Sequence, residues 1–161
     1  MGVVGRIQRA SRLLEQGLSD YFAGHGLQLW EFDILSTLLR SGPPYQLTAG
    51  ALGRASMISS GAVTNRIDRL AARDLVTRET DPANRRSVVI TLTASGRDLI
   101  NSALPGHIGN ENRLLSALAT ADQQQLASLL RTLLAALGDL PSAAPDRAPV
   151  RENMLALLYK H

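Results

Sequence analysis

The sequence predicts a mainly α fold of the α+β class, in which a series of amphipathic helices is interrupted by a single β-hairpin. Apolar residues recur at three- and four-residue steps through most of the chain, which is the period of a helix with one buried face. The exception lies at about residues 75 to 92, where apolar and polar residues alternate beyond a turn rich in Asp, Pro, Asn and Arg. We therefore predict helices through most of the chain and a pair of strands at about residues 75 to 92.

Composition excludes several classes of protein. With 161 residues, of which 45% are hydrophobic, the chain can bury one domain-sized core. Its formal charge of +3 is compatible with nucleic-acid binding, and the absence of cysteine excludes a disulfide framework, a thiol redox sensor and a thiolate metal site. No stretch reaches the roughly 18 consecutive apolar residues of a membrane span, and the first residues lack the features of a signal peptide. We expect a cytoplasmic protein with no membrane partner.

Two long helices are expected first. One spans about residues 3 to 23, where apolar side chains share one face, and Gly24 and Gly26 end it. The other runs over about residues 29 to 40 and is stopped by the Ser-Gly-Pro-Pro sequence at 41 to 44.

A short helix, a turn and a longer helix follow. The short helix is expected over residues 49 to 55 and the turn over 56 to 58, and the longer helix ends near Arg73. Thr48 can cap the start of the short helix, and Ser59 or Ser60 can cap the start of the longer one. In each case the side-chain oxygen can accept a free backbone N–H of the first turn.

Two antiparallel strands are expected next, over about residues 75 to 80 and 87 to 92, around a loop at 81 to 86. Val88, Ile90 and Leu92 alternate with polar residues, which suits a hairpin with one buried face. The order helix, turn, helix, strand, turn, strand is that of a winged helix-turn-helix, in which the second helix enters the major groove of DNA.

Two further helices are predicted near the end of the chain. Thr93 caps the first, which reaches about Leu118, and the second ends at Gly138. Thr120 and Gln123 have the spacing of a capping box at the start of the second. A kink in the first is predicted by Pro105, Gly106 and Gly109. The apolar stripe of the second consists of Leu126, Leu129, Leu130, Leu133, Leu134 and Leu137.

The helix that begins at Ser59 or Ser60 carries a slim, polar and basic face. Val63, Ile67 and Leu70 lie on the core side of this helix. Because an α-helix rotates by about 100° per residue, its other side chains point into solvent or lie on the flanks. A slim first turn lets such a helix approach base edges in the major groove. The candidate DNA-contacting residues here are Ser59, Ser60, Gly61, Ala62, Thr64, Asn65, Arg66 and Arg69.

The chemistry of these side chains matches DNA. Asn65 suits adenine, an arginine suits guanine, and the serines with the first backbone N–H groups can hold phosphate. Arg85 and Arg86 in the hairpin turn can enter a narrow minor groove, where the negative potential is enhanced. The alternatives are a solvated helix face and a solvated hairpin tip with surface ion pairs.

Four segments of the chain carry a recognisable signature: SGAVTNRIDRL at 60–70, LV.R at 75–78, DPANRR at 81–86 and LT..G at 92–96. They closely resemble the signature of the MarR family of transcription regulators. The resemblance implies a winged helix-turn-helix that binds double-stranded operator DNA, with Arg85 or Arg86 in the minor groove and Asp81 bracing the wing. Ala62 departs from the frequent Thr or Ser at its position, and Asn84 replaces the more usual Asp.

The resemblance also implies a domain organisation and a homodimer. It assigns residues 1–28 and 93–140 to dimerisation helices that interdigitate with those of a second chain, and residues 29–92 to the DNA-binding domain. Residues 141–161 are expected to form a linker and a short C-terminal helix. Two recognition helices about one DNA turn apart, roughly 34–36 Å, imply a pseudo-palindromic operator. The alternative is a bundle in which the terminal helices of one chain cover one another.

In this family many members are repressors that a small aromatic or anionic effector releases. The segments GLQLWEFDILSTLLRSGPPYQLT at 26–48 and HIGNENRLL at 107–115 resemble most the branch of PecS-type and urate-responsive regulators. Urate sensors carry a tryptophan in the first helix, whereas the single tryptophan here opens the second. The candidate effector-binding residues are Arg9, Arg12, Trp30, Asp33, Ile34 and His107. The alternatives are a core role for Trp30, a surface carboxylate at Asp33 and an exposed His107.

Other classes of function lack support. The sequence contains no HExxH, P-loop or GxSxG motif, and its histidines are scattered. We therefore predict no enzyme, catalytic residue, cofactor or metal site. The alternatives to a DNA-binding regulator are a winged-helix protein-interaction module that binds no DNA and, less favoured, a small enzyme.

Overall fold

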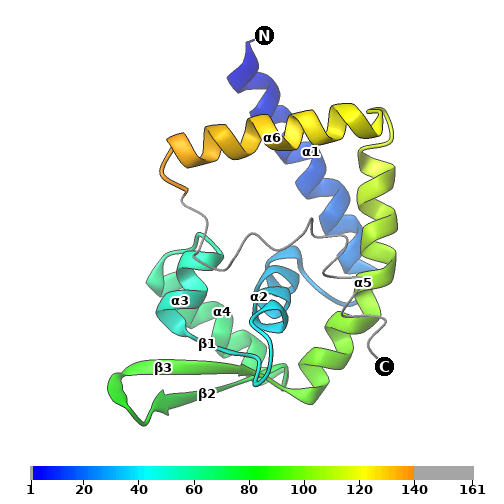
Figure 1. The fold of residues 1–161 in the computed structure, drawn as a ribbon. Coiled ribbons are helices and arrows are strands. Elements are labelled where there is room, and N and C mark those ends of the chain that lie inside the picture. The colour runs from blue at the N-terminus through cyan, green and yellow to red at the C-terminus, as the bar shows by residue number, and fades with distance from the viewer. Residues whose placement is uncertain (1, 140–161) are drawn as a thin grey trace. The chain divides into compact units, whose positions relative to one another are not determined.

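The computed structural model describes residues 2–139, and within them the chain forms six α-helices and three β-strands (Figure 1). This arrangement confirms the predicted mainly α fold with one small sheet. The linker and C-terminal helix expected at 141–161 lie outside the described residues. In chain order the elements are α1 (Val3–Ala23), α2 (Leu29–Arg40), β1 (Gln46–Thr48), α3 (Ala49–Ala55), α4 (Ser60–Ala72), β2 (Val76–Asp81), β3 (Asn84–Leu92), α5 (Ala94–Leu114) and α6 (Thr120–Ala136).

Among the described residues, 2–107 lie in one compact unit and 108–139 in a second. The first unit holds the main apolar core, in which the rings of Phe22 and Phe32 stack with centroids 4.0 Å apart. This contact joins the end of α1 to α2. The largest fully buried side chains of this unit are Phe22, Ile34, Leu35, Leu38, Leu52, Leu70, Ile90, Ile100 and Leu104.

The helix starts follow their capping residues. Thr48 Oγ1 accepts the Ala51 N–H at 3.2 Å at the start of α3, as the sequence predicts. The capping box of the structure lies at α2, where Gln28 and Glu31 satisfy each other's backbone N–H groups. This capping box was not predicted, because glutamine is not among the residues preferred at a helix N-cap.

The three strands form an antiparallel sheet in the order β1-β3-β2. Strand β1 has only three residues, too few to show a period of two, and it was not predicted. The prediction of a loop at 81 to 86 is wrong. Strand β2 continues to Asp81 and β3 begins at Asn84, so the connection has only two residues. Gly96 has to be a glycine, since a Cβ there would lie 2.1 Å from the Leu75 carbonyl oxygen.

The end of the described chain differs in detail from the prediction. Thr93 Oγ1 accepts the Gly96 N–H at 2.9 Å, which confirms the cap of α5, but the helix ends at Leu114 and not at Leu118. The predicted Thr120–Gln123 capping box is wrong. The residue before α6 is an alanine, and the Gln123 amide donates instead to the carbonyls of Leu115 and Leu118. The kink near Pro105 stays a prediction.

Candidate DNA-binding site

Helix α4 lies with one face in the core and the other in solvent. Val63, Ile67 and Leu70 are almost completely buried, as the helical period predicts. Ser59 is the N-cap, and its Oγ accepts the Ala62 N–H at 3.4 Å. Because the apolar side chains fix the rotation of the helix, its polar face points away from the core.

Helix α3 packs closely against α4. A Cβ at Gly53 would lie 3.0 Å from Val63 Cγ2, so a glycine lets the two helices approach. Met57, in the turn between them, has φ of 53° and leaves its side chain 74% exposed. The predicted turn at residues 56 to 58 is thus confirmed, and it holds α4 at a fixed angle to α3.

The first turns of α4 are narrow. Ser60, Gly61, Thr64 and Asn65 are exposed, and Ala62 is half-buried. A Cβ at Gly61 would meet no atom within 4 Å. Nothing in the protein fold therefore requires a glycine at this position, and another molecule can approach the backbone closely there.

Two arginines of α4 lie against a tryptophan of α2. The guanidinium carbon of Arg66 is 5.5 Å from the centroid of the Trp30 ring, and that of Arg69 is 4.9 Å from it. The Trp30 indole N–H donates to the side-chain oxygen of Gln28. Helical periodicity placed Arg69 on the outward face and Arg66 on its flank, but both long side chains bend toward α2. The expectation that Trp30 is an ordinary core aromatic is wrong, since it is only half-buried.

The hairpin is fastened to α4 by an ion pair. Arg78 in β2 donates to the carboxylate of Asp68 on the exposed side of the helix. Both side chains are about half exposed, at 45% and 54%, so the pair contributes little to stability. Its position orients the wing relative to α4.

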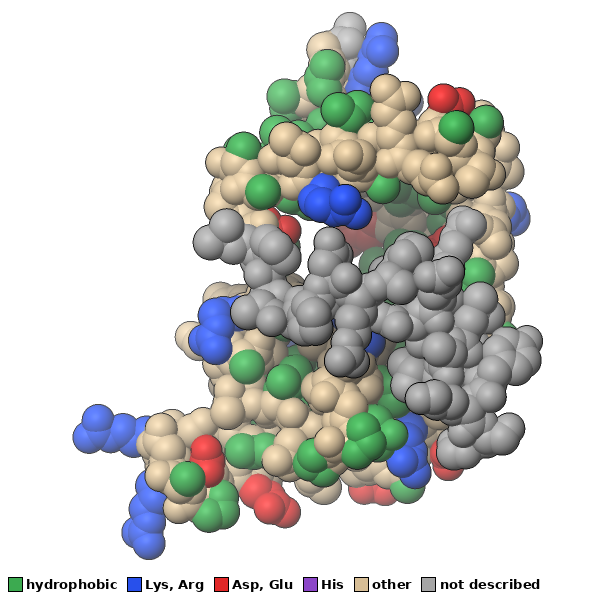
Figure 2. Space-filling view, viewed as in Figure 1, with side chains coloured by type: hydrophobic (Ala, Val, Ile, Leu, Met, Phe, Trp, Pro, Cys, Tyr) green, Lys and Arg blue, Asp and Glu red, His purple; other side chains and the backbone are tan. Residues whose placement is uncertain are grey.

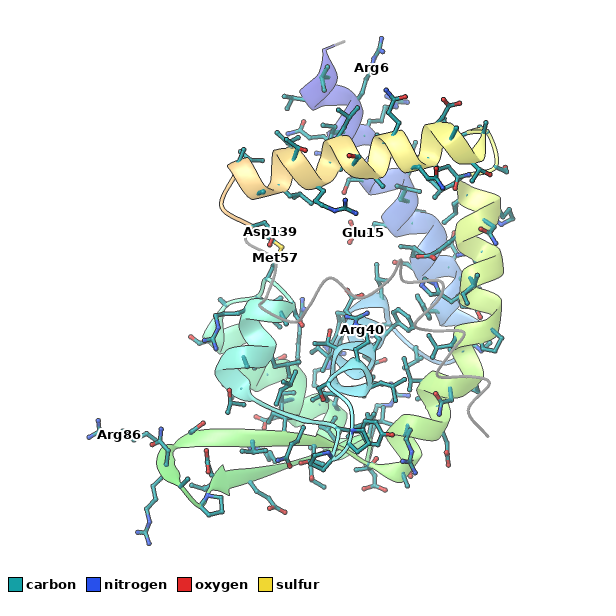
Figure 3. The ribbon with its side chains drawn as sticks, in the orientation of Figure 1. Arg6, Glu15, Arg40, Met57, Arg86 and Asp139 are labelled. Carbon is teal, nitrogen blue, oxygen red and sulfur yellow. The ribbon has the colours of Figure 1, made fainter. Side chains whose placement is uncertain are left out.

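The wing ends in two exposed arginines. Arg85 and Arg86 project from the tip of the β2–β3 hairpin, and Figure 3 shows Arg86 pointing away from the rest of the chain. Figure 2 shows the same end of the hairpin carrying basic side chains. Asp81 Oδ1 accepts the Ala83 N–H at 2.9 Å, and Asn84 Oδ1 accepts the Arg86 N–H at 3.1 Å. Asp81 and Asn84 thus each stabilise the backbone of the turn by accepting an N–H two residues further along the chain.

An open groove of about 520 Å³ lies within the first unit, between α1, the start of α2 and α4. Trp30 and Asp33 line it, as predicted, and Arg66 closes one side. The structure does not bring the other predicted effector residues into its lining. Ile34 is fully buried in the core, and Arg9 and Arg12 are exposed on α1. The residues that line the groove are Glu15, Ser19, Ala23, Leu27, Gln28, Leu29, Trp30, Asp33 and Arg66.

His107 is buried and not exposed. Its ring lies 4.7 Å from the Phe32 ring and 5.1 Å from the Phe22 ring, between centroids. Only 7% of its surface is accessible. His107 is therefore part of the aromatic core of the first unit and not of the groove lining.

Burial raises the pKa of the Asp33 carboxyl above its usual value. The nearby Arg40 and Arg66 act in the opposite direction, and the residue keeps over a third of its surface exposed. Burial likewise lowers the pKa of Arg40 from its usual value, which Asp33 partly offsets. Arg40 is labelled in Figure 3 at the end of α2.

The fold and the site have clear relatives. Residues 25–87 match the model of the MarR family. The chain is 37% identical over 130 residues to the HTH-type transcriptional regulator PecS of Dickeya dadantii, and the match covers 81% of this chain and 78% of PecS. This chain belongs to the MarR family. It is a winged helix-turn-helix transcription regulator and not an enzyme.

Solved structures of the MarR family agree with this assignment. AbsC of Streptomyces coelicolor superimposes with a TM-score of 0.76 at 25% identity, over 84% of this chain and 91% of AbsC. BpsR of Bordetella bronchiseptica, whose DNA binding is regulated by 6-hydroxynicotinic acid, gives a TM-score of 0.75 at 26% identity, over 82% of this chain and 92% of BpsR. Among residues 2–139 of this MarR-family chain, no helix is long and apolar enough to cross a membrane.

Proposed function

We propose that this regulator binds a pseudo-palindromic operator in the cytoplasm, with α4 in the major groove and the wing in the minor groove. The observation that carries the proposal is the pairing of a narrow, exposed helix start at Gly61 with two exposed arginines at the hairpin tip. A major groove about 12 Å wide admits a helix, whereas the narrower minor groove attracts arginine.

The roles of the residues follow from their positions. Asn65, exposed on the outer face, is suited to a bidentate contact with adenine, and Ser59 and Ser60 at the helix start are suited to phosphate. Arg85 and Arg86 supply positive charge to the minor groove. Gly61, Ala62 and Thr64 complete the surface that meets the bases, and Arg66 and Arg69 flank it.

We propose further that two copies of the chain act together. On α6, Leu126 and Leu129 are 42% and 62% exposed, and Leu137 at its C-cap is 74% exposed. On α1, Val3 and Leu13 are 74% and 64% exposed. Exposed apolar side chains on one helix mark an interface, and a second copy supplies a matching surface by symmetry. The helices of residues 1–28 and 93–140 are therefore the proposed dimerisation elements, and residues 29–92 the proposed DNA-binding domain.

The groove at Trp30 and Asp33 is the proposed effector site, and its occupation is proposed to release a repressor from DNA. Its volume lies in the range of about 300–1,000 Å³ that is typical of small-molecule sites. Its lining includes two acidic residues, Glu15 and Asp33, and one arginine, Arg66. This lining favours a neutral aromatic compound with N–H or O–H donors over the anionic compound that the sequence also allowed.

DNA binding is tested by measuring affinity at several salt concentrations. Asn65→Ala should lose discrimination among operator variants by about 1–3 kcal/mol. Arg85→Ala and Arg86→Ala should weaken binding evenly across sequences and lower the salt slope by about one unit per lost phosphate contact. If both wing variants bind like the parent at low and high salt, the wing is not a DNA contact.

The effector site is tested by titration with hydroxylated pyridines, phenolic acids, salicylates and purines. Trp30 is the only tryptophan in the chain, so its fluorescence reports binding at the groove. A compound that changes the fluorescence should also weaken operator binding, and operator DNA should weaken the compound's binding by the same factor. A panel that changes neither would contradict the effector site and leave DNA binding intact.

A further inference from the structure

We propose that Trp30 is a positioning residue for DNA binding, which orders Arg66 and Arg69 before DNA arrives. The proposal rests on the assignment of α4 as the DNA-reading helix. One indole contacts two guanidinium groups of that helix, at 5.5 Å and 4.9 Å from its centroid. Both distances lie within the roughly 6 Å limit for a cation–π contact.

The indole itself is held in place. Trp30 lies in the first turn of α2, and its ring N–H donates to the Gln28 side chain. The same Gln28 belongs to the capping box with Glu31 that fixes the start of the helix. These contacts fix the orientation of the indole ring. Because the ring is only half-buried, part of its surface is accessible to the two arginines.

A stacked arginine keeps its capacity to bind phosphate. The guanidinium is planar and carries five N–H donors around its edge, so an aromatic ring on its face leaves those donors available. Arg69 stays exposed, and Arg66 is half-buried at the groove. Because both guanidinium groups lie against Trp30 of α2, we expect them to contact the sugar–phosphate backbone and not the base edges.

The gain for binding is mainly entropic. The cation–π contacts exist in the free protein and persist in the complex, so most of their energy cancels. A long side chain that is already ordered, however, avoids about 0.5–1.5 kcal/mol of ordering cost on binding. For two arginines this corresponds to an affinity about 5- to 150-fold higher than with unordered side chains.

The test is a mutant cycle on a duplex that the parent protein selects from a randomised library. Trp30→Leu should weaken binding about 5- to 150-fold, and Trp30→Phe, which keeps an aromatic face, should restore most of it. With Arg66→Ala and Arg69→Ala already present, Trp30→Leu should change affinity less than about two-fold. An equal effect of Trp30→Leu with and without the arginines would overturn the proposal.

The salt dependence separates positioning from charge. Trp30→Leu leaves both positive charges in place, so the slope of log affinity against log salt should hardly change, whereas Arg69→Ala should lower it by about one unit. A slope that falls equally in both variants would contradict positioning. Failure of the parent to select any duplex would instead contradict the DNA-binding assignment itself.

A measurement without DNA covers the case in which Trp30→Leu unfolds. The fluorescence spectrum of Trp30 should shift in Arg69→Ala and in Arg66→Ala, because each removes a cation from its ring, and should stay unchanged in Arg54→Ala, an exposed arginine of α3. Identical spectra in all four proteins would show that the arginines do not rest on the indole and would overturn the proposal.

Discussion

Arg73 Nη1 lies 2.6 Å from Glu31 Oε1, and this ion pair joins the C-cap of α4 to the first turn of α2. The other Glu31 oxygen accepts the Gln28 N–H at 2.8 Å, and Arg73 also donates to the Gly26 carbonyl at 3.0 Å. The Glu31 side chain is only 5% exposed. Because both of its oxygens have partners, this carboxylate holds α2 and α4 in a fixed relation.

Replacing the Glu31 carboxylate should destabilise the folded protein. Glu31→Gln keeps the shape and removes the charge, so it should lower the free energy of unfolding by about 1–3 kcal/mol. Glu79→Gln, at an exposed position of β2, is the matched control and should stay within about 0.5 kcal/mol of the parent. Chemical denaturation measures both, and equal effects would contradict a structural role for the pair.

Gly61→Ala should separate stability from DNA binding. The added methyl meets no protein atom, and alanine favours a helix, so stability should rise by up to about 1 kcal/mol. Operator binding should fall by about 1–3 kcal/mol, because the methyl would crowd a packed contact with DNA. Chemical denaturation of the same variant is the control, because its stability and its operator affinity should move in opposite directions. Unchanged operator binding in Gly61→Ala would show that this face does not meet DNA.

The leucine stripe of α6 should be essential for the dimer. Leu130→Asp combined with Leu134→Asp would place two charges without partners in the proposed interface. Sedimentation should then show monomer or aggregate, whereas Ser128→Asp, which the helical period places on the face opposite the leucine stripe, should leave the dimer intact. A native-like dimer in the double variant would contradict the proposed interface.

The raised pKa of Asp33 predicts a pH dependence of stability. The folded state favours the neutral carboxyl, so this contribution is fully present below the ordinary pKa of 3.8 and is lost as pH rises through the higher pKa of the folded protein. Asp33→Asn cannot ionise and should gain stability relative to the parent over that window. The measurement is the difference in unfolding free energy between the two proteins from about pH 3 to pH 7. A difference independent of pH would rule out the raised pKa.

Local patterns in the sequence predicted the helices well. The apolar period gave α1 and α2 their observed bounds, and Thr48 and Ser59 are the caps that their side chains indicated. These features depend on a few neighbouring residues, which is why one sequence suffices. Strand β1 was not predicted, because it forms only by pairing with β3 and its three residues are too few to show an alternating pattern.

The site was predictable in outline but not in its contacts. Helical periodicity gives the direction of Cβ, and Asn65 and Gly61 are exposed accordingly. It says nothing of where a long side chain ends, so the bend of Arg66 and Arg69 toward Trp30 was missed. The ion pair of Arg78 with Asp68 likewise joins residues from different elements. His107 seemed available for a ligand because its burial depends on two phenylalanines far away in the chain.

Chemical protection of the selected duplex by dimethyl sulfate tests the central claim, that α4 reads the major groove and the wing the minor groove. Guanine N7 lies in the major groove and adenine N3 in the minor groove, so the two modifications report the two contacts separately. We predict two tracts of protected guanine N7 with centres about 10–10.5 base pairs apart, or a multiple of that spacing, each flanked by protected adenine N3 that Arg85→Ala and Arg86→Ala expose. Protection of the minor groove alone, or of a single tract, would contradict the account.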